Sequence, residues 1–239
     1  LEAVAATERP RQVEASPDGL TLAFMLDRDT SDVWTLPSAG GTPTRLTTGR
    51  ALAAFWEDGN AVWSPDSRRL AYTQAGKVHV VAAGGGVPVA ICDGSGPVWL
   101  DDQRLIVGIE RGDSTVLAVV ALGDPWPQPL ATAGADYVTA VVSPDRSRVA
   151  YTVFHRDDLN CTSLQVVDVA TRVNREVVRH PGFQLRDPVW SPDGQTIAFA
   201  SEWPGWYEVF TVDADDGAAP RQLTTDDADF HDLSFTVDG

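Results

Sequence analysis

The chain has 239 residues, of which 43% are hydrophobic, and its 18 basic and 34 acidic side chains give a net charge of −16. A surface this acidic repels phosphate backbones, so no nucleic acid is expected as a partner. No apolar run approaches the roughly 18 residues of a membrane-spanning helix, and residues 1–6 lack the basic leading region of a signal peptide. No membrane partner is expected, and the length allows one large all-β domain or two average ones.

A short turn motif recurs along the chain and sets its organisation. Ser16-Pro17-Asp18-Gly19 returns three times with the same Ser-Pro-Asp core, and degenerate copies begin at Leu100 and Thr236. The six copies begin at positions 16, 64, 100, 143, 191 and 236, in steps of 48, 36, 43, 48 and 45. Such a period suits four short strands with their turns, which is one blade of a β-propeller.

The elements within each repeat follow one order. In the last complete repeat, residues 188–190 form a short apolar strand and residues 191–194 a turn, in which Pro presets φ, Asp bonds local backbone and Gly supplies a positive φ. Strands over 196–200 and 208–213 follow, with the alternation and β-branched content of a stacked sheet, and residues 220–224 close the blade. Equivalent second strands are predicted at 22–24, 70–72, 105–107 and 149–151, and third strands at 32–34, 77–79, 115–117 and 163–165.

The predicted fold is all-β, a β-propeller of four-stranded blades with five full repeats and the first strand of a sixth. We expect a single domain over residues 1–239, with blades at about 10–50, 61–95, 97–135, 138–182 and 187–228 and a partial blade at 232–239. A closed propeller removes its sheet edges by completing the ring. A stop inside the turn after a first strand therefore favours a larger propeller, and a small five-bladed ring is the alternative.

Catalytic and metal motifs are missing from the sequence. There is no Gly-x-Ser-x-Gly elbow, and the nearest segment, Gly112–Ser114, has the pattern of a hairpin turn, so no catalytic residue is expected. The acidic stretch 226–232 lacks the ligand spacing of a calcium loop, which favours a solvated connection. The four histidines (His79, His155, His180 and His231) have no metal-ligand spacing, and the two cysteines (Cys92 and Cys161) have no metal-ligand or redox spacing. No metal or cofactor is therefore expected, and both thiols are predicted to be buried.

Two aromatic segments are candidates for binding. Residues 203–207 place two tryptophans and a tyrosine in one turn, where they could line a ligand surface or, as the favoured alternative, pack between neighbouring blades. Residues 55–58 place an acidic pair beside two aromatic rings in the connection into the second blade, where the pair could receive an amino terminus or lie in an exposed loop. The candidate substrate-binding residues are Glu57, Asp58, Trp203, Trp206 and Tyr207.

The repeat resembles that of known propellers. Residues 189–201 and 220–224 are similar to the blade repeat of TolB-type propellers and of the amino-terminal propeller in the prolyl oligopeptidase family, including acylaminoacyl and dipeptidyl peptidases. Residues 201–210 resemble the peptidases more than TolB. The peptidase resemblance implies seven or eight blades that cap an α/β-hydrolase domain, admit short peptides and exclude folded proteins. It places the Ser-Asp-His triad beyond Gly239, and Glu57 and Asp58 loosely resemble the amino-terminus anchor of dipeptidyl peptidases.

This resemblance favours one function over two others. It implies the non-catalytic, substrate-gating propeller of a cytoplasmic prolyl-oligopeptidase-type serine peptidase, with short peptides and a hydrolase domain of the same polypeptide as partners. A TolB-like propeller would instead scaffold protein partners in a bacterial envelope, with a periplasmic location. A lactonase-like propeller enzyme needs metal-binding carboxylate, Asn and His side chains around its channel, and the sequence offers no such set.

Overall fold

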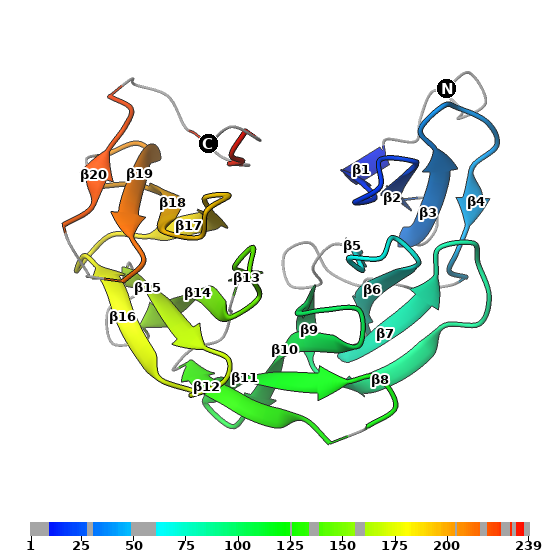
Figure 1. The fold of residues 1–239 in the computed structure, drawn as a ribbon, viewed down its shortest axis with the longest axis horizontal. Coiled ribbons are helices and arrows are strands. Elements are labelled where there is room, and N and C mark those ends of the chain that lie inside the picture. Colours follow the sequence, from blue (N-terminus) through cyan, green and yellow to red (C-terminus); the bar gives the residue numbers. More distant parts are fainter. Residues whose placement is uncertain are drawn as a thin grey trace. The chain divides into compact units, whose positions relative to one another are not determined.

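The computed structural model describes residues 10–27, 31–48, 61–124, 126–133, 139–155, 161–203, 205–215, 219–225, 230 and 233–236. Every regular element in these ranges is a β-strand, which confirms the all-β prediction. The same ranges hold no helix long and apolar enough to cross a membrane. The strands form five four-stranded antiparallel sheets, each built from four consecutive strands, which are the blades of a β-propeller (Figure 1).

The chain divides into two compact units, and each is described by itself. The first unit holds Leu1–Ile109 and Val119–Gln128, and the second holds Glu110–Ala118 and Pro129–Gly239. Blades 1 and 2 lie in the first unit and comprise β1 (Pro10–Ala15), β2 (Thr21–Asp27), β3 (Ser31–Pro37), β4 (Thr44–Arg45), β5 (Val62–Trp63), β6 (Arg69–Gln74), β7 (Lys77–Ala82) and β8 (Val89–Asp93).

Blade 3 contributes residues to both units, and blades 4 and 5 lie in the second. Blade 3 comprises β9 (Ser95–Trp99), β10 (Arg104–Arg111), β11 (Ser114–Ala121) and β12 (Gln128–Ala133). Blades 4 and 5 comprise β13 (Ala140–Val142), β14 (Arg148–His155), β15 (Cys161–Asp168), β16 (Asn174–Arg179), β17 (Leu185–Trp190), β18 (Thr196–Ser201), β19 (Glu208–Asp213) and β20 (Arg221–Gln222). The expectation that all blades form one domain stays a prediction.

The Ser-Pro-Asp turn joins the first two strands of a blade with the same bonds in each copy. In blade 4 the Ser143 hydroxyl donates to Asp145 Oδ1 at 2.6 Å and accepts the backbone N–H of Arg148 at 2.9 Å. The turn also needs a left-handed residue, which is Arg146 here (φ 63°) and Gly194 in blade 5 (φ 70°). The serine is buried in all four copies, so its hydroxyl stabilises the turn of the hairpin and is not exposed as a nucleophile.

A tryptophan just before the motif ties adjacent blades within each unit. In the first unit the indole N–H of Trp63 donates to the carbonyl of Glu14 at 3.3 Å, and that of Trp99 donates to the carbonyl of Val62 at 3.0 Å. In the second unit Trp190 donates to the carbonyl of Val141 at 3.1 Å. Each ring is buried, so one side chain supplies both apolar packing and a directional bond to the preceding blade.

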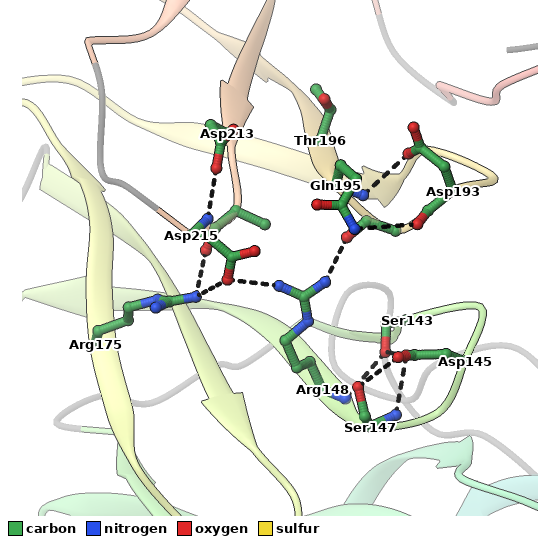
Figure 2. A network of polar contacts seen from close by, with 12 residues as sticks. Ser143, Asp145, Ser147, Arg148, Arg175, Asp193, Gln195, Thr196, Asp213 and Asp215 are labelled. Atoms are coloured by element: carbon green, nitrogen blue, oxygen red, sulfur yellow. Dashed lines mark hydrogen bonds and ion pairs between the residues drawn. The ribbon is translucent and has the colours of Figure 1, made fainter.

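An arginine at the start of the second strand makes a further link between blades 4 and 5. Arg148 donates to the carbonyl of Gly194 at 2.5 Å and to Asp215 at 2.9 Å, and its guanidinium carbon lies 5.0 Å from the Trp190 ring centroid. Figure 2 shows Arg148 and Arg175 converging on the same carboxylate. In the first unit Arg69 repeats the arrangement, over Trp99 and bonded to the Asp102 carbonyl.

Apolar cores lie between the faces of adjacent blades in each unit. In the first unit the core joins Val33 and Leu46 of blade 1 to Trp63, Leu70 and Tyr72 of blade 2. In the second unit the core joins blades 4 and 5 and includes Ala150, Leu164, Val178, Leu185, Ile197, Phe199 and Phe210. Burial of such faces is the main favourable term in folding, and here it fixes blade 1 against blade 2 and blade 4 against blade 5.

One expectation differs from the structure, and another concerns residues that are described only in part. Cys161 is buried as predicted, whereas Cys92 is only half-buried because it lies on β8, the outermost strand of its blade. Of the residues expected to form a partial sixth blade, only 233–236 are described; they form no strand, and the partial blade stays a prediction.

Candidate functional site

The aromatic segment 203–207 lies in the connection between β18 and β19, in the second unit. The Trp203 backbone N–H donates to Ser201 Oγ at 3.3 Å, and the Gly205 N–H donates to the Glu202 carbonyl at 2.6 Å. Gly205 has φ 132°, a conformation that other residues rarely adopt, so glycine allows this tight return of the chain. Trp203 is 40% exposed and Trp206 is 50% exposed. Both rings therefore present large apolar surface to solvent rather than packing fully between blades.

Trp203 begins a ladder of aromatic rings that runs from the surface into the core of the second unit. Its ring stacks on His180 at 4.2 Å between centroids and on Phe210 at 5.8 Å, and Phe210 in turn stacks on Phe199 at 5.7 Å. Phe183 meets the edge of His180 at 4.8 Å. Phe199 and Phe210 are almost fully buried, so the stacked rings fix Trp203 on its core side while the rest of its ring stays exposed to solvent.

A cavity of about 250 Å³ lies beside this ladder. Its lining includes His180, Phe183, Phe199, Trp203 and Phe210, together with the Ser201 side chain. Most of the other lining residues are aliphatic, and the polar ones are Ser201, His180 and Arg179. A surface that is mostly apolar with a few polar groups accepts an apolar or aromatic group. Both blades of the second unit contribute, because His180 and Phe183 belong to the connection between β16 and β17.

Tyr207 belongs to a second cluster in blade 5. The guanidinium carbon of Arg186, on β17, lies 3.5 Å from the centroid of the Tyr207 ring. The Tyr207 hydroxyl lies 3.4 Å from Gln184 Oε1, and the Gln184 backbone N–H donates to Glu202 at 3.1 Å. The connection between β18 and β19 and the start of β17 are thus joined by polar contacts and by a cation–π contact.

A bulge in the first strand of the blade positions Arg186. The pairing of β17 with β18 shifts register between Arg186 and Val189, and Asp187 has φ 53°. Gln12 in blade 1 (φ 54°) and Gly96 in blade 3 (φ 58°) also lie four residues before the motif and share the left-handed conformation. Bulges re-aim side chains and are frequent next to functional sites.

The predicted site residues divide into three groups in the structure. Trp203, Trp206 and Tyr207 lie together on one connection, with Trp203 at the cavity and Tyr207 against Arg186. Glu57 and Asp58 lie outside the described residues, as does the acidic stretch 226–232 apart from Phe230. Their roles stay predictions.

Sequence reasoning did not identify His180, Phe183 or Arg186 as site residues. The sequence signal that could have indicated Arg186 is its position in the repeat, since Arg186 and Asp187 directly precede the apolar segment 188–190. Among the described residues, no group of three or more His, Cys, Asp or Glu side chains could hold a metal ion.

Comparisons with known proteins place this fold. No protein-family model and no curated protein matches the sequence. A puromycin-hydrolysing peptidase of Mycobacterium tuberculosis superposes with a TM-score of 0.72 at 15% identity over 91% of this chain and 39% of the peptidase. TolB from Acinetobacter baumannii superposes with a TM-score of 0.66 at 15% identity over 88% of this chain and 53% of TolB. An oligogalacturonate lyase from Vibrio parahaemolyticus superposes with a TM-score of 0.65 at 17% identity over 88% of this chain and 63% of the lyase.

The fold is therefore that of the propellers in prolyl-oligopeptidase-type peptidases and TolB proteins, as the repeat predicted. A prolyl endopeptidase matches in the same way, with a TM-score of 0.69 over 92% of this chain and 37% of that enzyme. The chain spans less than two thirds of the length of each of these structures. Identities of this size establish the fold alone, because one propeller architecture carries many functions.

Proposed function

We propose that this chain is the propeller part of a prolyl-oligopeptidase-type serine peptidase and that it controls the access of short peptides to a hydrolase domain of the same polypeptide. The observation that carries the proposal is the superposition, which reaches TM-scores of 0.69 to 0.72 for the peptidases and 0.65 to 0.66 for the TolB protein and the lyase. The chain corresponds to 37–39% of those peptidases, and it has no nucleophile elbow of its own.

The aromatic cavity supports a role in peptide binding. A volume of about 250 Å³ walled by Trp203, Phe199 and Phe210 suits one apolar side chain of a peptide rather than a folded protein surface. Trp203 is the accessible member of this wall, at 40% exposure. Its replacement by alanine should therefore weaken the binding of peptides with a large apolar residue.

The test uses the native gene product from its source cells. Its intact mass is measured, and it is treated with a fluorophosphonate probe that labels activated serines. A product much larger than 25.7 kDa that labels supports the peptidase proposal. A product near this mass that does not label overturns it and leaves a TolB-like binding scaffold as the better account.

A second test uses the 239-residue chain alone. It should bind short peptides without cleaving them, and Trp203→Ala should weaken binding by about tenfold, which corresponds to about 1.4 kcal/mol. The control is Trp126→Ala, since Trp126 is 75% exposed and lies in the first unit. Equal affinity in both variants would show that Trp203 takes no part in binding.

A further inference from the structure

Arg186 is fixed by a ring and left without a hydrogen bond. Its guanidinium carbon lies 3.5 Å from the Tyr207 ring centroid. Its Nε is buried and has no hydrogen-bond partner among the described residues. The nearest carboxylate oxygen, Asp187 Oδ2, is 3.7 Å from that nitrogen, beyond hydrogen-bond distance. A buried donor without a partner is unfavourable, so hydrogen bonding within the protein does not explain why this arginine is held here.

The rest of the guanidinium is open to solvent. The Arg186 side chain is 41% exposed, and its terminal nitrogens are neither buried nor hydrogen-bonded to described residues. By contrast Arg69, Arg104, Arg148 and Arg175 all donate to carboxylates or carbonyls. In a chain with 34 acidic side chains, an arginine held half-buried and without a hydrogen bond is an exception that packing alone does not explain.

The strand holds the backbone of Arg186 in place, while its charged group lies over the Tyr207 ring and 3.7 Å from Asp187. Leu185 is buried on one side of it, and Pro188 is buried on the other. The bulge at Asp187 breaks the strict alternation, so Arg186 and Asp187 are both partly exposed in succession. Backbone, ring and neighbouring side chains therefore preorganise the guanidinium, which lowers the entropy lost when a ligand binds.

We propose that Arg186, seated on Tyr207, binds the carboxylate at the carboxyl terminus of a short peptide. The planar guanidinium offers parallel N–H donors that match the two oxygens of a carboxylate, and stacking on an aromatic face orients this fork. The inference rests on the proposed function for its choice of a peptide, but the carboxylate follows from the chemistry of the site. Trp206, next to Tyr207 in sequence, is also exposed.

The experiment compares the binding of matched peptides to the 239-residue chain by calorimetry. An N-acetylated dipeptide with a free carboxyl terminus should bind about tenfold tighter than its carboxyl-terminal amide. Arg186→Gln should abolish this difference, and Arg186→Lys should restore only part of it, because lysine keeps the charge and lacks the fork. A third peptide, amidated at its terminus but containing glutamate, tests the other source of a carboxylate. If it binds as tightly as the free acid, the assignment to the carboxyl terminus is overturned.

Controls separate a specific site from bulk charge. Arg221→Gln removes the same charge from an exposed position on β20 of the same blade and should leave all three affinities unchanged. N-acetylglycine is titrated as a minimal carboxylate, and its binding should depend on Arg186. Equal binding of acid and amide overturns the carboxylate site but leaves the peptide proposal standing. Binding of N-acetylglycine without any peptide binding overturns the peptide proposal and retains the carboxylate site, and binding of neither overturns both.

Discussion

The link made by Arg148 between blades 4 and 5 gives a prediction whose size can be worked out from the structure. Arg148→Ala removes a charge-assisted hydrogen bond to the Gly194 carbonyl, about 1.5–3 kcal/mol, and a stacking contact on Trp190, about 0.5–1 kcal/mol. The ion pair with Asp215 adds little, because that carboxylate is 56% exposed. The expected loss in the free energy of unfolding is about 2–4 kcal/mol.

The matched control is Arg104→Ala. Arg104 begins the second strand of blade 3, as Arg148 does in blade 4, but it bonds only Asp101 in its own turn and its side chain is 47% exposed. Its loss should cost no more than about 1 kcal/mol. Urea unfolding followed by tryptophan fluorescence measures both variants against the parent chain. If Arg148→Ala costs no more than Arg104→Ala, the reasoning that this arginine clamps adjacent blades is wrong.

Three further predictions concern buried hydroxyls, turns and pH. Tyr151→Phe should cost about 1 kcal/mol in urea unfolding because its hydroxyl donates to a side-chain amide at 2.9 Å, whereas Tyr72→Phe should be neutral or stabilising because that buried hydroxyl has no partner among the described residues. Arg146→Gly should stabilise the protein by about 0.5–1 kcal/mol and Gly194→Ala should destabilise it by about 1 kcal/mol, because the backbone is left-handed at both positions. Thermal unfolding of the two variants and the parent measures both effects. Hydrogen bonds from two serine hydroxyls lower the pKa of Asp145 to about 2 from 3.8, so its contribution is present above pH 4 and lost as the pH falls from about 4 to 2. Asp145→Asn should therefore flatten the parent's loss of stability across that range, as measured by urea midpoints.

The blades could be predicted from the sequence because each one is specified by local chemistry. The four Ser-Pro-Asp turns close with bonds among residues at most five apart, so the motif fixes its own geometry. The strand after each turn is buried along most of its length, as in β6, β14 and β18. In the next strand, such as β19, buried positions alternate with more exposed ones, which sets the register. Even the degenerate copy at Leu100 forms the turn, where Asp101 alone accepts the N–H groups of Gln103 and Arg104.

The candidate site could be predicted only in part, because its partners are distant in sequence. The aromatic turn at 203–207 was visible as composition, but stacking of Trp203 on His180 joins residues 23 positions apart. The bulges show a similar limit. Gly96 is a residue that favours positive φ, whereas Gln12 and Asp187 adopt the same conformation without that signal. Tertiary pairing imposes their conformation, and a single sequence does not reveal it.

Stability and binding are placed on different positions of the same repeat. The buried members of each blade, such as Leu185 and Trp190 in β17, form the core and the links to the preceding blade. Arg186 lies between them: its backbone pairs with Ala200 of β18, but its side chain makes no hydrogen bond with the described residues. Because the Arg186 side chain is held by one ring contact and one long ion pair rather than by the core, it can change without loss of the fold. Arg186→Gln should accordingly leave the free energy of unfolding, measured in urea, within about 0.5 kcal/mol of the parent, and a larger loss would mean that the arginine is held for packing rather than for a ligand.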